Sequence, residues 1–112
     1  MGLTLKNKFS KEYDIPYSKF AKLRDDIYVF LKQKTDQNPL EEGTLLFLEM
    51  ADCDGKLSYK DCKQILKDIQ EMPDSGRLYG YVGRGSDNCL TITKFKELLK
   101  DCASHRCNLS WC

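Results

Sequence analysis

The sequence predicts an all-α fold: one domain over residues 1–112, with an extra N-terminal helix and a cysteine-rich C-terminal tail. Apolar residues recur every three or four positions in several segments, and residues that favour helix N-caps precede those segments. A chain of 112 residues is also long enough to bury one hydrophobic core.

The first helix is predicted over residues 17 to about 34. Its apolar positions share one helical face, opposite lysines and aspartates, and are Phe20, Leu23, Ile27, Phe30 and Leu31. Asp14 is the candidate N-cap, and Pro16 suits a first turn because its missing N–H is not needed there. Residues 1–13 are polar and basic without a clear period, so we expect a loose N-terminal arm.

Two more helices are predicted in the middle of the chain. Asn38 and a first-turn proline begin one over residues 39 to about 50, and the polar cluster at 52–55 ends it. Ser58, with Asp61 three residues later, forms a capping pair for a third helix that runs to about residue 72.

The glycine-rich stretch over residues 73–89 argues against a long helix and leaves room only for a short one over 77–82. Thr91 or Thr93 is the candidate cap of a last helix, which runs to about Cys102. Residues 103–112 are the cysteine-rich tail.

Residues 50–61 lie between two predicted helices and place acids around a glycine. This stretch resembles the twelve-residue EF-hand loop, in which a calcium ion takes six to eight oxygen ligands. The resemblance covers residues 39 to about 100 and implies a calcium site, with Gly55 at its turn. The implied metal ligands are Asp52, Asp54, the carbonyl of Lys56, Ser58 and Asp61.

Two departures weaken the implied calcium site. Met50 replaces the usual first aspartate, and Asp61 is shorter than the usual closing glutamate. We therefore expect one calcium ion at most, bound weakly, with Glu49 as a substitute ligand if the loop is one residue longer. The alternative is a polar turn that binds no metal.

EF-hand loops come in pairs, and residues 83–94 are the expected partner of the first loop. In that alignment Leu90 matches Leu57, so the two are expected to face each other in a short antiparallel bridge. Lys94 stands where the closing acid should be, and its ammonium group would repel calcium.

Charge and hydropathy narrow the possible partners. Eighteen basic and seventeen acidic residues are interspersed along the chain, which predicts no nucleic-acid binding. No apolar run is long enough to cross a bilayer, so we expect no membrane partner, and the polar first twenty residues do not resemble a signal peptide.

Six cysteines are many for a reducing compartment, and an even count suits three disulfides whose pairing the sequence leaves open. This favours an extracellular or secretory-pathway location, in which case a leader would have been removed; a cytoplasmic location is the alternative. Another reading is a zinc site in the tail, formed by Cys102, His105, Cys107 and Cys112.

His105 is the only histidine and has no nucleophile motif around it, so no enzymatic activity is expected. Tyr79, Tyr81 and Trp111 are expected to pack in the core rather than to anchor a partner. The sequence thus predicts a non-catalytic, EF-hand-like module that binds an unidentified protein partner. The alternatives are an intracellular calcium sensor with free thiols and a zinc-stabilised interaction domain.

Overall fold

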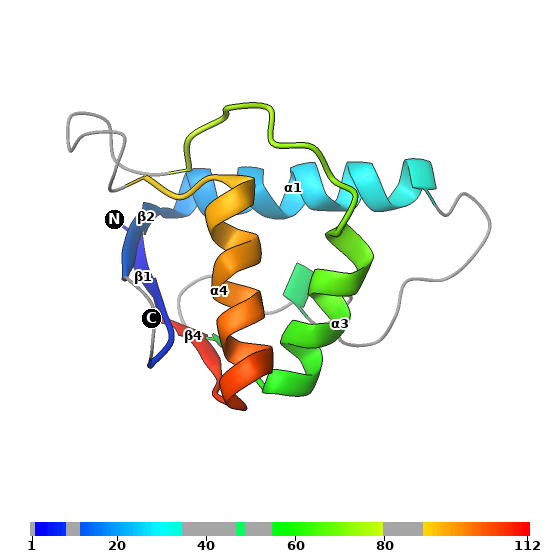
Figure 1. Ribbon diagram of the computed structural model, residues 1–112. Helices are drawn as coiled ribbons and strands as arrows, with labels where there is room; N and C mark the ends of the chain where they lie inside the picture. The colour runs from blue at the N-terminus through cyan, green and yellow to red at the C-terminus, as the bar shows by residue number, and fades with distance from the viewer. Residues whose placement is uncertain (1, 9–11, 35–46, 49–54, 80–88) are drawn as a thin grey trace.

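The computed structural model describes residues 2–8, 12–34, 47–48, 55–79 and 89–112, and these form a mixed α/β fold (Figure 1). A four-stranded antiparallel sheet packs against the helices, so the prediction of an all-α fold was wrong. The helices are α1 (Tyr17–Lys34), α3 (Tyr59–Ile69) and α4 (Ile92–His105); the strands are β1 (Gly2–Lys6), β2 (Tyr13–Pro16), β3 (Gly55–Leu57) and β4 (Leu109–Trp111).

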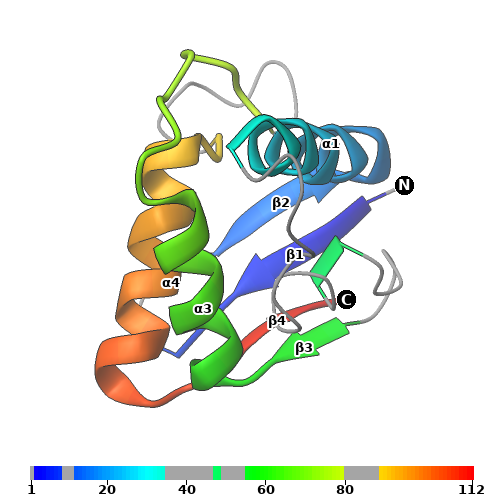
Figure 2. The ribbon, with the colours of Figure 1, turned by 90° about the vertical axis from the view of Figure 1, so that its right-hand side faces the viewer.

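The strands lie in the order β2-β1-β4-β3, so the C-terminal strand sits between the N-terminal strand and a strand from the middle of the chain. Figure 2 shows the helices on one face of this sheet. Ser110 of β4 is the cross-strand partner of both Lys6 on β1 and Lys56 on β3. These three residues therefore form a row on the face that points away from the helices.

The predicted arm and tail both contribute strands to the sheet. β1 lies in the predicted N-terminal arm and forms a hairpin with β2, which begins at Tyr13, the last residue of that arm, and continues through residues predicted to cap and begin the first helix. β4 lies in the predicted cysteine-rich tail. Alternate side chains of these strands enter the core, namely Leu3, Leu5, Tyr13, Ile15, Leu109 and Trp111. The sequence does not predict these strands, because each of them buries only two side chains, too few to establish a period of two.

The apolar face predicted for the first helix is confirmed. Phe20, Leu23, Ile27 and Leu31 of α1 are buried, and Phe30 packs partly buried against them. Above the sheet, aromatic rings cluster around Trp111, whose indole lies 5.4 Å from the Phe20 ring and 5.7 Å from the Phe47 ring, measured between centroids. The guanidinium of Arg24 lies 4.5 Å from the centroid of the Phe20 ring, which adds a cation–π contact to this cluster.

Two predicted N-caps are confirmed. The Ser58 hydroxyl accepts a hydrogen bond from the Asp61 amide at 3.3 Å, and the Thr91 hydroxyl accepts one from the Lys94 amide at 3.2 Å. α3 ends at Ile69, before the predicted residue 72, and α4 continues to His105, past the predicted end at Cys102. Of the predicted helix over 39–50, the structure describes only residues 47 and 48, which are helical.

Asp14 is not the cap of the first helix. It lies in β2, where its carboxylate accepts a hydrogen bond from the Thr4 hydroxyl of β1 at 2.9 Å. A strand runs directly into α1 here, so the residue that the sequence offered as a cap serves the hairpin instead.

The predicted bridge between Leu57 and Leu90 was wrong. Leu57 pairs with Leu109 of β4, and Leu90 forms an isolated bridge with Tyr79. The physical reason is that β4 occupies the pairing edge of β3. A short helix was predicted over residues 77–82, but residues 77–79 are not helical. Tyr79 instead forms the bridge with Leu90, and its buried side chain donates a hydrogen bond to Asp26 of α1 at 2.5 Å.

None of the described helices is long and apolar enough to span a bilayer.

Tyr79 and Trp111 are both buried, which confirms that they pack in the core; Tyr81 lies outside the described residues.

Gly55 provides a test of how closely β3 and β4 pack. A Cβ atom at this position would overlap the indole ring of Trp111, which is fully buried and cannot move into solvent. We expect Gly55→Ala to lower the free energy of unfolding by about 1–3 kcal/mol in urea titrations, as overpacking does. Lys63→Ala, at an exposed position on α3, should change it by less than about 0.5 kcal/mol. Equal effects of the two substitutions would contradict this packing.

Candidate thiol and anion site

Three thiols meet where α3, α4 and the turn after α4 come together. Cys62 belongs to α3, Cys102 to α4, and Cys107 follows the end of α4. The Cys102 sulfur is hydrogen-bonded to the thiols of both Cys62 and Cys107. Cys62 and Cys102 are fully buried and Cys107 is 8% exposed. We refer to these three residues as the thiol cluster.

The end of α4 explains why two of these thiols are adjacent. Arg106 adopts the left-handed conformation, with φ 52° and ψ 42°, and its amide donates to the Cys102 carbonyl. The Cys107 amide donates to the same carbonyl at 3.1 Å. This is the hydrogen-bond pattern of a Schellman-type helix end, which brings the side chains at positions 102 and 107 into contact.

The loop after β1 adds a further donor to the cluster. The Asn7 side-chain amide donates to the Cys102 sulfur at 3.4 Å and to the Leu98 carbonyl at 3.2 Å. Hydrogen bonds from Cys62 first, then from Asn7 and Cys107, lower the pKa of Cys102 to about 7 against the opposing effect of burial. Cys102 is therefore the thiol of the cluster that most readily becomes a thiolate.

The other two thiols stay protonated to higher pH. The hydrogen bond to Cys102, followed by burial, raises the pKa of Cys62. Burial and then the negative charge at Cys102 raise the pKa of Cys107, although the backbone amide of Lys8 donates to its sulfur and acts in the opposite direction. The cluster thus pairs one acidic thiol with two proton donors.

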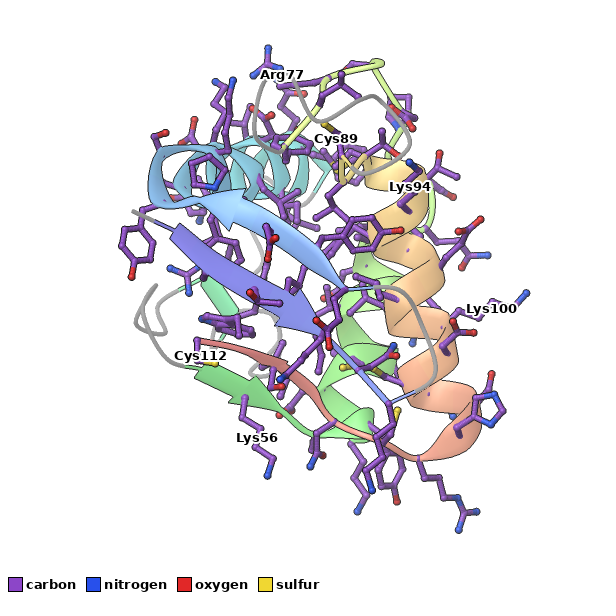
Figure 3. All side chains as sticks on the ribbon, turned by 90° about the vertical axis from the view of Figure 1, so that its left-hand side faces the viewer. Lys56, Arg77, Cys89, Lys94, Lys100 and Cys112 are labelled. Atoms are coloured by element: carbon purple, nitrogen blue, oxygen red, sulfur yellow. The ribbon has the colours of Figure 1, made fainter. Side chains whose placement is uncertain are left out.

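A pocket of about 420 Å³ opens beside the cluster. Residues from β1, β3, the end of α4 and β4 line it: Lys6, Asn7, Lys8, Lys56, His105, Arg106, Cys107, Asn108 and Ser110. We call it the basic pocket. Figure 3 shows Lys56 projecting from β3 and Lys100 projecting from α4, well apart from each other.

Charge in the basic pocket is strongly one-sided. Its described lining includes three lysines and one arginine and no aspartate or glutamate, although the whole chain has a net charge of only +1. The sheet register contributes to this, because Lys6 and Lys56 flank Ser110 on neighbouring strands. A site of this composition attracts anions.

The residues predicted to bind calcium are only partly described. Asp52 and Asp54 lie outside the described residues. Lys56 lies in β3 and lines the basic pocket, while Ser58 and Asp61 form the N-cap of α3. Near the expected second loop, the Lys94 ammonium donates to the Cys89 carbonyl at 3.1 Å.

The cysteines are arranged differently from the proposed zinc set. Within the described ranges, no three or more His, Cys, Asp or Glu side chains are placed to hold a metal ion. Cys112 lies at the opposite end of β4 from Cys107, and its carbonyl accepts a hydrogen bond from the Thr4 amide at 3.0 Å. Cys62, Cys102, Cys107 and Cys112 are free thiols.

The sequence does not single out Asn7, Lys6, Lys8 or Cys62 as site residues. Cys62 and Cys102 each lie on the apolar face of a helix, which was the available signal that they share a core.

No family model, curated protein or solved structure matches this chain.

Calcium binding by the loop over residues 50–61 stays a prediction. We expect calorimetry to detect at most one ion per chain, with millimolar affinity and a loss of heat in Asp54→Ala. Asp87→Ala, in the expected second loop, is the matched control and should leave the titration unchanged. Two ions, or binding unaffected by Asp54→Ala, would place the site elsewhere.

The low pKa of Cys102 predicts a pH-dependent stability. The Cys102 thiol has its ordinary pKa of 9.0 in the unfolded chain and a pKa of about 7 in the folded protein. Its contribution to the free energy of unfolding is therefore complete above pH 9 and is lost as the pH falls towards 7. The groups that act on this sulfur are Cys62, Cys107, Asn7 and Asp101. Under reducing conditions, the free energy of unfolding of the parent minus that of Cys102→Ser should increase between pH 7 and 9. A difference that stays constant across this range would contradict the assignment.

Proposed function

We propose that this protein is a non-catalytic binding module and that the basic pocket is its site for a small anionic ligand. The observation that carries the proposal is the lining itself: four cationic lysine and arginine side chains and no carboxylate among the described residues. In a chain with nearly equal numbers of acids and bases, this separation of charge favours one class of ligand.

Coulomb energies support an anion as the ligand. A unit charge 4 Å from a cation gains about 1 kcal/mol in bulk water and about 4 kcal/mol near a protein surface. Several cations around one cavity therefore supply enough energy for binding at micromolar to millimolar ligand concentrations, provided that the ligand's desolvation is offset by hydrogen bonds.

The pocket also offers hydrogen-bond donors. Asn108 and Ser110 lie among the cationic side chains, so an oxyanion would meet both charge and directional donors. The sheet and the end of α4 hold these groups in place, which limits the ordering cost of binding.

Inorganic phosphate and pyrophosphate are suitable probes, monitored by amide chemical shifts in NMR titrations at low salt. We expect shifts centred on the pocket and an affinity that falls with ionic strength, because exposed charges are screened. Pyrophosphate should bind more tightly, since it carries more negative charge.

Two substitutions test the pocket while preserving the fold. Lys56→Gln removes a charge from β3, and Arg106→Gly removes one while keeping a residue that accepts the positive φ of 52°. Each should weaken pyrophosphate binding by about 3- to 10-fold. Lys100→Gln, an equal charge change at an exposed position outside the pocket lining, is the matched control. Equal effects of all three would show that only the overall charge matters.

A further inference from the structure

The thiol cluster and the basic pocket share one residue. Cys107 lines the pocket and is slightly exposed, whereas Cys62 and Cys102 are fully buried behind it. A reagent that enters the pocket therefore meets Cys107 first, and the next sulfur inward is Cys102.

We propose that the ligand of the basic pocket is a small anionic disulfide and that Cys107 and Cys102 become joined in a reversible disulfide by exchange with it. The choice of an anionic ligand rests on the proposed function; the pairing of the two cysteines rests on the geometry at the end of α4. The pair is set by the left-handed Arg106 and by the hydrogen bond from the Cys107 amide to the Cys102 carbonyl.

The exchange takes place in two displacements. In the first, the Cys107 sulfur loses its proton and attacks one sulfur of the ligand; the ligand's S–S bond breaks, and the departing half takes up a proton as a thiol. In the second, the Cys102 sulfur, deprotonated in turn, attacks the Cys107 sulfur of the mixed disulfide, and the second half of the ligand leaves as a thiol. Two protein thiols and one small disulfide thus become one protein disulfide and two small thiols. The protein is oxidised and the ligand reduced by two electrons.

The surroundings favour the departure of the ligand's thiolates in both displacements, whereas the raised pKa of Cys107 slows the first attack. Lysine and arginine side chains around Cys107 stabilise the thiolate that leaves in each step. Asn7 donates to the Cys102 sulfur and holds it beside Cys107. Cys62 belongs to α3, is fully buried and is not part of the pocket lining, so it serves as a donor to the Cys102 sulfur rather than as the exposed attacking thiol.

Oxidised glutathione, which carries several carboxylates, is the anionic probe, and cystamine, a cationic disulfide, is its matched counterpart. The fully reduced full-length protein is treated with each probe, quenched with acid, and studied by intact mass and by peptide mapping. We expect a bridge between Cys102 and Cys107 that forms at least about 10-fold faster with oxidised glutathione, because like charges repel cystamine from the pocket.

Variants separate the two displacements. Cys102→Ser should stop at a stable glutathione adduct on Cys107, and Cys107→Ser should form neither the adduct at this site nor the bridge. Cys112→Ser, at an exposed cysteine outside the pocket lining, should behave like the parent. Because the parent protein is mapped directly, the test does not depend on either variant being folded.

The outcomes distinguish this inference from the proposed function. A bridge that contains Cys62, or no bridge between Cys102 and Cys107, would overturn the inference, while pyrophosphate binding would still support the anion site. Equal rates with the two probes would overturn the choice of an anionic disulfide. If pyrophosphate also failed to bind, the proposed function would fail while the cysteine pairing stood.

Discussion

The insertion of the C-terminal strand into the middle of the sheet is the constraint on which the rest of the structure depends. β4 pairs with β1 on one side and β3 on the other, so the N-terminal hairpin and the middle of the chain share a sheet only through residues 109–111. The same strand carries Trp111 into the aromatic cluster and places its indole against Gly55. Packing of β3, β4 and α1 is therefore a single cooperative arrangement, because each of them contacts Trp111 or its partners.

This constraint also builds the candidate site. For the chain to enter the sheet after α4, it must reverse direction immediately after His105, and the left-handed Arg106 makes that reversal. The reversal brings Cys107 back beside Cys102. Pairing of β4 then brings Ser110 between Lys6 and Lys56, so that cations from two strands far apart in the sequence line one pocket. The thiol cluster and the basic pocket are thus two consequences of one turn and one strand pairing.

Local interactions explain which features the sequence could predict. The face of α1 and the caps at Ser58 and Thr91 depend on residues within a turn of one another, and the sequence predicted them, with Thr91 as one of two candidate caps. The strands depend on partners up to about a hundred residues away, and a strand such as β4, with only Leu109 and Trp111 pointing inward, has no local signal strong enough to distinguish it from a tail. The expected pairing of Leu57 with Leu90 failed for the same reason. The site was equally hidden, because the count of cysteines says nothing about their neighbours, and the cations of the pocket come from segments far apart in the sequence, at Lys6 and Lys8, Lys56, and Arg106.

The charge of the thiol cluster links it to the pocket. A thiolate at Cys102 places a negative charge behind the pocket, where it opposes an anionic ligand and offsets part of the attraction of the cations. A disulfide between Cys102 and Cys107 removes that charge, so an oxidised protein should hold anions more tightly than a reduced one at a pH above the pKa of Cys102. Because linkage is reciprocal, a bound anion that does not react must favour the protonated or oxidised forms of the cluster by the same factor. The backbone needs little rearrangement for this coupling, since the end of α4 already holds both sulfurs in contact, and electrostatics alone is enough to connect the state of the thiols with occupancy of the pocket.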